Sequence, residues 1–287
     1  NSRAIADLFA DEAGKFVCAS AGHNLEALMA AHGSGAVDLS RTLGKTILNV
    51  DIGGGTTKFA LVKGGEILQT AAVSVGGRLL ARGSDGIVTR VEPSARRLAQ
   101  TVGFNPEVGG RLEADQEKRL IQRFVELLAA CIQHGGLPAE YADLMLTDRL
   151  QLTGPPEALT FSGGVSEYIY EREHVNHGDL GLPLAQELVR AMSDGRLNLP
   201  RLDPGQGIRA TVIGASQFSV QVSGNTIAIS DRALLPVHNI PVVFPRLDLG
   251  SDIVPEVVAS EIHRALGRFD LSVHGDEVVA VAVRWQG

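Results

Sequence analysis

The sequence predicts an α/β fold with a mixed sheet, followed by a small α+β appendage. Three strand-like runs separated by glycine-rich turns come first in the main part, at residues 46–50, 58–62 and 66–75. Helical patterns then alternate with short apolar runs, which is typical of an α/β sheet. After residue 224 the pattern changes to a strand-like run, several prolines, one helix and a closing strand-like run, which indicates a separate small part.

Composition excludes several classes of protein. The chain has 287 residues, of which 44% are hydrophobic, so it is long enough to bury a sizeable core. Lys and Arg number 26 against 33 Asp and Glu, and no basic run occurs, so we expect no nucleic-acid partner. The sequence has no signal-peptide pattern and no long uncharged run, so we expect no membrane partner. The two cysteines, Cys18 and Cys131, lack the spacing of a disulfide framework or a zinc site, which favours a reduced cytoplasmic location.

The N-terminal region is expected to contain short secondary-structure elements and is rich in small residues. Two brief elements are predicted, a helix at 2–9 and a strand at 16–19. A longer helix follows, because Asn24 is a residue type that caps helix N-termini and Gly33 is one that ends helices.

The three strand-like runs predict an antiparallel meander. Lys63-Gly-Gly65 lies between the second and third runs, and two glycines between β-branched, apolar stretches are a hairpin signal. A fourth strand is expected at 87–91, and Pro93 is well placed to open a helix that runs to about Val102.

The strongest predicted helix lies in the middle of the chain and ends at the glycine pair 135–136. Its apolar residues fall on one stripe, at Leu120, Phe124, Leu127, Leu128 and Cys131. Three elements are expected after it, a strand at 158–161, a helix at 184–192 and a strand at 208–213. This β-β-β-α-β-α-β order is that of a ribonuclease-H-like lobe.

The region after residue 224 is interpreted as a small α+β appendage. Its predicted elements are a strand at 225–230, a helix with apolar positions from Val254 to Phe269, and a strand at 278–285. Because the last predicted strand lies almost at the end of the sequence, we expect the appendage to be truncated and the chain to be an excised fragment.

Asp51-Ile-Gly-Gly-Gly-Thr-Thr57 is the leading candidate for a binding site. It lies between two predicted strands, and Gly53, Gly54 and Gly55 lack the Cβ atoms that would keep an anion away from the backbone N–H groups. Thr56 and Thr57 add hydroxyl donors, and Asp51 is placed to hold Mg²⁺ through water. The alternative is a plain glycine-rich hairpin in which Asp51 only binds the turn backbone.

Two further glycine segments favour a nucleotide site over a plain hairpin. Ser162-Gly-Gly-Val-Ser166 follows an apolar strand, and its Gly163 and Gly164 are expected to lie against an adenosine. Gly76-Gly77-Arg78 follows the third strand and is expected to line the same cleft. Because strand ends meet at one edge of an open α/β sheet, these segments are expected to converge there.

Longer stretches carry a family resemblance. The turn at Asp51 resembles the second phosphate loop of the superfamily of actin, Hsp70 and sugar kinases, and Ala158–Val165 resembles the adenosine motif of that superfamily. Four stretches together resemble the reactivating factors of ethanolamine ammonia-lyase, namely Ser20–Ala27, Asn49–Lys58, Phe161–Tyr170 and Gly214–Gly224.

This resemblance implies an actin-like ATPase lobe that belongs to a molecular chaperone. The expected cofactors are ATP and Mg²⁺, and the expected partner is ethanolamine ammonia-lyase, from which damaged cobalamin is released. It also implies three regions: 1–43 as the end of a first lobe with a connecting helix, 44–224 as the second lobe, and 225–287 as the appendage. No first phosphate loop precedes Asp51, so this chain is expected to present half of an ATP site. A cytoplasmic location is implied, with association with a bacterial microcompartment left open.

Rival interpretations remain open at the level of sequence. The same superfold supports small-molecule kinases and actin-like scaffold proteins, whereas no spacing suggests covalent catalysis. Gly44-Lys45-Thr46 is not expected to be a Walker A motif, because Leu39 stands where that motif requires glycine. The segment from His174 to Asp179 carries possible metal ligands but is expected to be a loop that is free to touch a partner. Glu117 and Lys118 are either ribose contacts or exposed charges.

Overall fold

The computed structural model describes residues 22–217, 240–247, 253–275 and 278–283. The chain divides into two compact units, residues 26–219 and residues 1–25 with 220–287, and each is described by itself. The elements predicted at 2–9, 16–19 and 225–230 lie outside the described residues.

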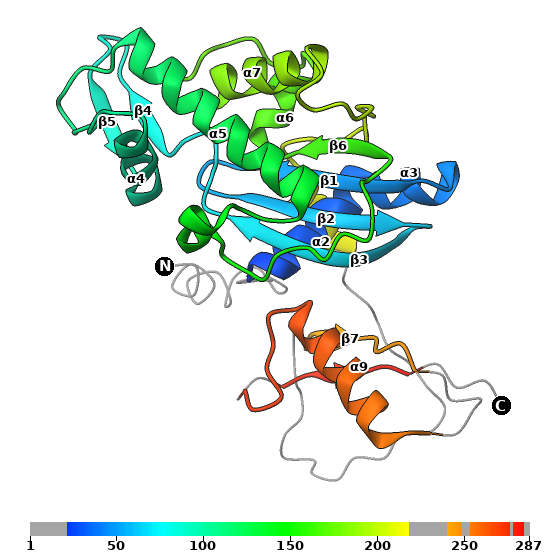
Figure 1. Cartoon of the computed structure of the whole chain (residues 1–287). Helices are drawn as coiled ribbons and strands as arrows, with labels where there is room; N and C mark the ends of the chain where they lie inside the picture. The colour runs from blue at the N-terminus through cyan, green and yellow to red at the C-terminus, as the bar shows by residue number, and fades with distance from the viewer. Residues whose placement is uncertain (1–21, 218–239, 248–252, 276–277, 284–287) are drawn as a thin grey trace, which may run out of the picture. The chain divides into compact units, whose positions relative to one another are not determined.

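A four-stranded mixed sheet forms the centre of the larger unit (Figure 1). Its strands, in spatial order, are β3 (Glu66–Val73), β2 (Thr57–Lys63), β1 (Thr46–Ile52) and β6 (Ala158–Ser162). The first three pair antiparallel, and β6 pairs parallel with β1. Gly64 and Gly65 form the turn between β2 and β3 with positive φ, which glycine adopts at no steric cost. The predicted meander and the mixed sheet are confirmed.

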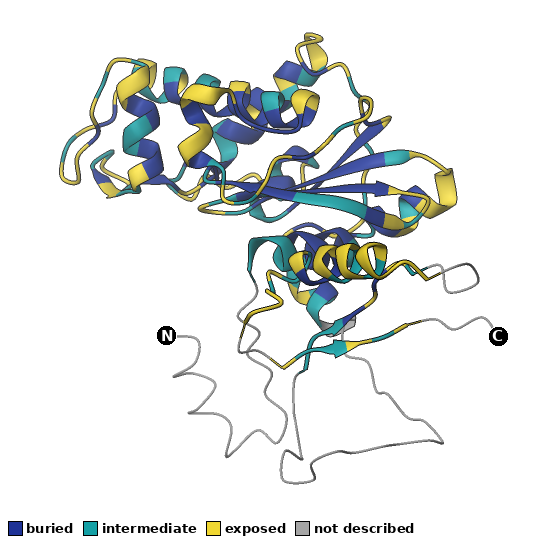
Figure 2. Ribbon diagram, turned by 60° about the horizontal axis from the view of Figure 1, so that its bottom comes forward, coloured by how far each residue is buried: buried dark blue, intermediate teal, exposed yellow. Residues whose placement is uncertain are grey.

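One face of the sheet packs against the main apolar core. Leu48, Val50 and Ile52 of β1 point into this core, and all three are fully buried. The helices that supply the other side of the core are α5 (Ala114–His134), α6 (Gly164–Ile169) and α7 (Gly181–Ser193). Figure 2 shows the strands largely buried beneath helices whose outer sides are exposed.

The long helix α5 matches its prediction closely. All five residues of its predicted apolar stripe are buried in the core. Glu113 caps its N-terminus in a capping box with Gln116, and Gly135 ends it in the left-handed conformation.

Helices rich in small residues lie on the opposite face of the sheet. The buried residues of α2 (His23–Ser34) include three alanines, Gly33 and Ser34, and α3 (Ala36–Leu43) follows it directly. Ser34 of α2 bonds to Asn49 of β1, which places the C-terminal end of α2 over the sheet. Short side chains let a helix approach closely, so a short polar side chain of α2 can bond directly to a strand.

The strand predicted at residues 208–213 is wrong, because this segment turns into α8 (Ala210–Gln217). The β-branched run Thr211–Ile213 suggested a strand, but contacts between helices override that local preference. A Cβ at Gly33 of α2 would lie 1.9 Å from the carbonyl oxygen of Ala210, and one at Gly214 would lie 1.9 Å from that of Met29. The two helices therefore pack backbone to backbone through these glycines.

Smaller elements complete the larger unit, namely β4 (Leu80–Arg82), β5 (Val88–Val91), α4 (Pro93–Thr101) and the 3₁₀ helix η1 (Ala139–Leu144). The predicted strand and proline-led helix at 87–102 are confirmed, whereas β4 and η1 had no clear signal in the sequence. The segment after η1 covers the outer edge of β3, where Leu146 N donates to Ala72 O.

The smaller unit has a minimal α+β arrangement. Its described elements are β7 (Val242–Val243), α9 (Pro255–Gly267) and β8 (Ala280–Val281). β7 and β8 pair parallel, and Val243, Ala265 and Leu266 form a small core. The predicted helix is confirmed; the strand predicted at 278–285 is described only up to residue 283, and there it is shorter than expected. Across both units, none of the helices that the structure describes has the length and apolar character needed to cross a membrane.

Candidate functional site

The glycine turn joins β1 to β2 at one end of the sheet. Gly53 N donates a hydrogen bond to Thr56 O at 3.0 Å, which closes the turn. Gly54 and Gly55 are exposed, and a Cβ at Gly55 would meet no atom within 4 Å. The backbone of the turn therefore borders open space, as close approach of an anion requires.

The segment Gly76-Gly77-Arg78 lies directly against this turn. Gly77 N donates to Gly53 O at 2.9 Å, and Arg78 N donates to Gly54 O at 2.7 Å. A Cβ at Gly76 would lie 2.6 Å from Gly54 O, so only glycine fits at that position. Both glycines are buried, whereas Arg78 is exposed at the edge of the turn.

The third glycine segment joins the same assembly. Gly163 has a φ of +81°, and a Cβ there would lie 2.4 Å from the carbonyl oxygen of Ile52. A Cβ at Gly77 would lie 2.7 Å from Cγ2 of Val165, so the second and third segments also touch. Gly164 opens α6 and is half-buried. The structure thus brings together all three segments that the sequence predicted would converge.

Asp51 is a buried carboxylate at the end of β1, directly behind the turn. Its side chain accepts a hydrogen bond from Ser162 Oγ at 2.8 Å, and the residue is 4% exposed. Burial raises the pKa of Asp51, while the Ser162 hydrogen bond and the charge of Lys58 lower it. Burial is the largest of these effects, so the folded protein makes this carboxylate costly to ionise.

A chain of buried hydrogen bonds extends from Asp51 away from the turn. Asn49 Nδ2 donates to Ser162 Oγ at 3.1 Å, and Thr160 Oγ1 donates to Asn49 Oδ1 at 2.9 Å. Ser34 Oγ of α2 reaches the same Asn49 oxygen at 3.4 Å. All of these side chains are buried.

Sequence reasoning missed this polar chain as a unit, although a signal was present. Asn49 and Asp51 alternate with apolar residues in β1, and Thr160 and Ser162 do the same in β6. Such a period of two places all four side chains on one face of the sheet. Only the parallel register, with Asp51 opposite Ser162, shows that they meet.

An ion pair lies beside the buried carboxylate. Lys58 is the cross-strand neighbour of Asp51, and its Nζ lies 2.8 Å from Glu26 Oε2 of α2. The Lys58 side chain is 13% exposed and that of Glu26 is 32% exposed, so the pair is partly shielded from water. Neither residue was singled out from the sequence.

Two candidate side chains are already engaged inside the protein. Thr57 is fully buried, and its hydroxyl donates to Val75 O at 2.7 Å, so its proton is directed away from the outer side of the turn. Thr56 is half-buried beside the turn. Glu117 pairs with Arg82, whose Nη1 lies 2.5 Å from Glu117 Oε2.

The donor set at the site suits a hydrated hard cation better than a protein-caged metal. Among the residues that the structure describes, no group of three or more His, Cys, Asp and Glu side chains is placed to hold a metal ion. A carboxylate oxygen such as that of Asp51 is the ligand type that Mg²⁺ prefers, and Mg²⁺ usually keeps several waters and takes other ligands from phosphates. Asp51 beside an open glycine turn fits this mode of binding.

The segment from His174 to Asp179 is an irregular loop, as predicted, and only Asp179 forms an isolated bridge, with Ala81. Glu173 accepts hydrogen bonds from the backbone N–H groups of His174 and Val175, and its other oxygen lies 3.4 Å from His177 Nε2. These backbone hydrogen bonds lower the pKa of Glu173. Its carboxylate therefore serves to shape the loop.

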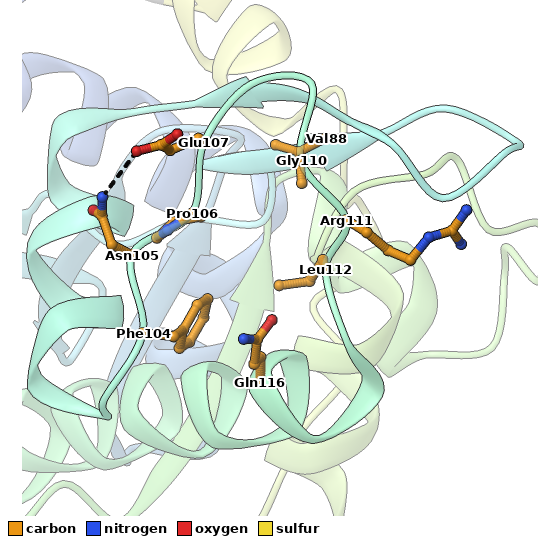
Figure 3. A pocket seen from close by; sticks show the side chains of 9 residues that line it. All are labelled: Val88, Phe104, Asn105, Pro106, Glu107, Gly110, Arg111, Leu112 and Gln116. Carbon is orange, nitrogen blue, oxygen red and sulfur yellow. Dashed lines mark hydrogen bonds between the residues drawn. The ribbon is translucent and has the colours of Figure 1, made fainter.

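The two best-defined hollows lie away from the glycine turn. One, of about 190 Å³, lies between β5, the 104–112 segment and the start of α5 (Figure 3). Figure 3 shows Arg111 extending away from Phe104 and Leu112, while Asn105 bonds to Glu107 at its rim. The other, of about 330 Å³, lies between α6, α7 and residues 171–174. The glycine turn borders an open surface and not one of these cavities.

Fold and site together define a class of protein. It is the class of α/β proteins in which glycine segments from neighbouring strands converge at one end of a mixed sheet, beside a buried carboxylate.

Comparison with known proteins gives the particular family. Residues 1–286 match the family described as Ethanolamine utilisation protein EutA, and the chain belongs to that family. The resemblance seen in the sequence is thereby confirmed.

Individual relatives and solved structures show the extent of the similarity. The chain is 34% identical over 282 residues to the ethanolamine ammonia-lyase reactivase EutA of Salmonella typhimurium strain LT2, covering 97% of this chain and 58% of that protein. It is 36% identical over 249 residues to the protein of the same name from Escherichia coli K12, covering 85% and 52%. The chain thus spans little more than half the length of these relatives. A structure of MreB 5 of Spiroplasma citri bound to AMPPNP aligns with 20% identity and a TM-score of 0.33, covering 67% of this chain and 57% of that one.

Proposed function

We propose that this chain is the nucleotide-binding lobe of an ATP-dependent chaperone that reactivates ethanolamine ammonia-lyase by releasing damaged cobalamin. The match of residues 1–286 to the EutA family, whose curated relatives are named reactivases of that lyase, carries this proposal. The convergence of three glycine segments at one sheet end supports the nucleotide part of it.

Each predicted residue then has a defined role. The backbone of Gly53, Gly54 and Gly55, with the hydroxyl of Thr56, contacts the phosphates, and Asp51 holds hydrated Mg²⁺. Such a cation supplies positive charge that offsets the charge of the phosphates. The remaining residues line the cleft: Gly76, Gly77 and Arg78 near the phosphates, and Gly163 and Gly164 near the adenosine.

Thr57 has a different role in this proposal from the one its sequence position suggested. Because its hydroxyl donates to Val75 O, it holds β2 against the segment that carries Gly76. It supports the turn from behind and does not contact phosphate.

Reactivation requires that nucleotide binding change the affinity for the lyase. A ligand shifts a conformational equilibrium only by its differential affinity for the two states. We propose that a further lobe of the complete gene product supplies the opposing phosphate loop and that ATP draws the two lobes together. On this view the present chain alone binds nucleotide weakly.

The test is a reactivation assay with the complete gene product. Ethanolamine ammonia-lyase is first inactivated with cyanocobalamin and then mixed with the protein, ATP, Mg²⁺ and adenosylcobalamin. We expect deaminase activity to return with wild type and not with Asp51→Asn. No recovery with wild type, or equal recovery with the variant, would refute the proposal.

Two further results would replace the proposal by one of its rivals. Steady phosphorylation of a small metabolite by ATP would indicate a kinase. Sedimentation of the protein in a nucleotide-dependent manner would indicate a filament-forming scaffold.

A further inference from the structure

We propose that Ser162, oriented by Asn49, is a positioning residue that directs one oxygen of Asp51 inward and leaves the other for the hydrated cation. This inference rests on the proposed nucleotide and Mg²⁺ site. It assigns a role to two buried polar side chains that were not among the predicted binding residues.

The direction of each hydrogen bond follows from donor chemistry. The Asn49 amide nitrogen is only a donor, so the hydroxyl oxygen of Ser162 must accept at their 3.1 Å contact. A carboxylate is only an acceptor, so the Ser162 proton must point to Asp51 Oδ1 at 2.8 Å. Ser162 therefore has one orientation that satisfies both neighbours.

The orientation of the Asn49 amide follows from that of Ser162. Its oxygen accepts from Thr160 Oγ1 at 2.9 Å and from Ser34 Oγ at 3.4 Å. Turning the amide over would place its oxygen against the Ser162 oxygen, whose only proton points to Asp51, so this buried contact would be lost. The Thr160 hydroxyl, and the Ser34 hydroxyl that also lies 3.2 Å from Ala31 O, could accept from the turned nitrogen and do not decide the orientation. The whole row thus has a single polarity, and it ends at Oδ1 of Asp51.

This polarity matters because of where Asp51 lies. Its Oδ1 is held by a residue on the neighbouring strand, and the carboxylate plane is fixed relative to the turn by that bond. A cation held through water requires its carboxylate in a defined place, because loose ligands must be ordered when the ion binds. Without Ser162 the Asp51 carboxylate loses the hydrogen bond that orients it. The conformational entropy lost when the cation orders the carboxylate then weakens binding of the cation.

The experiment measures nucleotide affinity of the complete gene product with and without Mg²⁺. A fluorescent ATP analogue is titrated at a series of MgCl₂ concentrations and again in excess chelator. We expect Ser162→Ala to raise the half-saturating Mg²⁺ concentration about tenfold or more, because it removes a hydrogen bond to a charged group. Affinity in chelator is expected to stay within about twofold of wild type, which a general loss of structure would not allow.

Two further variants sharpen the result. Ser162→Cys keeps a similar volume with a weaker donor, so it is expected to shift the Mg²⁺ requirement in the same direction but less, even if the alanine variant folds poorly. Ser40→Ala removes a buried hydroxyl that donates to Lys45 O just before β1 and lies outside the polar row, and we expect it to leave the Mg²⁺ requirement within about twofold.

Several outcomes would overturn the inference. These are an unchanged Mg²⁺ requirement in both Ser162 variants, an equal shift in Ser40→Ala, or equal losses with and without Mg²⁺. Wild-type binding that ignores Mg²⁺ would instead refute the cation site in the proposed function, and the inference would fall with it.

Discussion

At the scale of single residues, the site combines an open backbone turn with a carboxylate that the fold makes costly to charge. Asp51 is 4% exposed, and its one hydrogen bond from Ser162 only partly offsets burial. Groups whose ionisation is disfavoured in the fold are typical of functional positions, where stability is given up for binding. This makes Asp51 the residue at which stability and binding should respond in opposite directions.

We predict that Asp51→Asn stabilises the folded chain at neutral pH. Burial raises the pKa of Asp51 above its usual 3.8, so the folded state keeps the proton to a higher pH than the unfolded chain does. The free energy of unfolding of wild type should therefore fall as pH rises from about 3.8 through the folded-state pKa, and then level off. Asparagine carries no charge and still accepts the Ser162 hydrogen bond.

Urea unfolding of both proteins from acidic to neutral pH checks this prediction. The stability difference should be smallest at the acidic end and grow with pH. A wild type that equals or exceeds Asp51→Asn at neutral pH would contradict it.

The glycines of the site should differ sharply in what they tolerate. A Cβ at Gly76 would lie 2.6 Å from Gly54 O, so Gly76→Ala should destabilise the chain by about 1–3 kcal/mol. A Cβ at Gly55 would meet nothing within 4 Å, so Gly55→Ala should change stability by less than about 0.5 kcal/mol. Thermal unfolding of the two variants measures this difference.

Nucleotide affinity is a second measurement on the variants Gly76→Ala and Gly55→Ala. If phosphate occupies the open space beside Gly55, the Gly55→Ala variant should lose affinity while it keeps its stability. Wild-type affinity in Gly55→Ala would place the phosphates elsewhere.

At the scale of elements, the close packing of α2 against α8 is the least expected contact. Gly33 and Gly214 face the backbone of the opposite helix, each with only 1.9 Å between an ideal Cβ and a carbonyl oxygen. This contact also holds α2, with Ser34 and Glu26, over the polar face of the sheet.

We predict that Gly214→Ala separates these helices and destabilises the larger unit by about 1–3 kcal/mol or more, because the new methyl group meets backbone and not a movable side chain. Gly267→Ala is the matched control, since Gly267 also lies in a helix but its Cβ would meet nothing within 4 Å. Alanine there should be neutral or stabilising by about 0.5–1 kcal/mol. Chemical denaturation measures the free energy of unfolding of both variants. Equal values for Gly214→Ala and Gly267→Ala would contradict the close packing of α2 against α8.

Sequence patterns predicted those elements whose shape follows from local periodicity. The strands β1 to β3 and the helix α5 have clear periods and glycine boundaries, and the structure confirms them. The strand predicted at residues 208–213 was wrong, because the local sequence does not show that Gly214 packs against the helix that contains Gly33. Long-range packing decided that segment against its β-branched composition.

The same distinction divides the site. The convergence of its three glycine segments was predictable, because the ends of neighbouring strands meet at one edge of an open α/β sheet. The inward direction of the Thr57 hydroxyl and the pairing of Lys58 with Glu26 depend on where other segments pack, 18 and 32 residues away in the chain respectively. The row from Asn49 to Asp51 likewise exists only once β6 lies beside β1.

At the scale of the whole molecule, the chain separates into units with unequal cores. Among the residues that the structure describes, the larger unit holds the largest fully buried side chains, whereas the smaller unit buries Val243, Ala265 and Leu266 in its core. The candidate site lies wholly within the larger unit.

We predict that a chain of residues 22–219 folds alone. Its main unfolding transition should fall within a few degrees of that of the 287-residue chain, because the core of the larger unit draws only on its own elements. Calorimetry of both chains is the measurement. Loss of cooperative unfolding in the shorter chain would show that the remaining residues are required for its stability.

The buried polar row has a consequence for how the chain reaches its fold. β1 and β6 are separated by more than 100 residues, and a shift of their register by two residues would keep every apolar side chain on the same face of the sheet. Asn49 and Asp51 find their partners only when they stand opposite Thr160 and Ser162. A slip by one residue would turn the carboxylate into the apolar core, and a slip by two would leave one strand's polar group unmatched. The buried polar row therefore favours one register of these two distant strands. In that register Gly163 lies against Ile52 behind the turn.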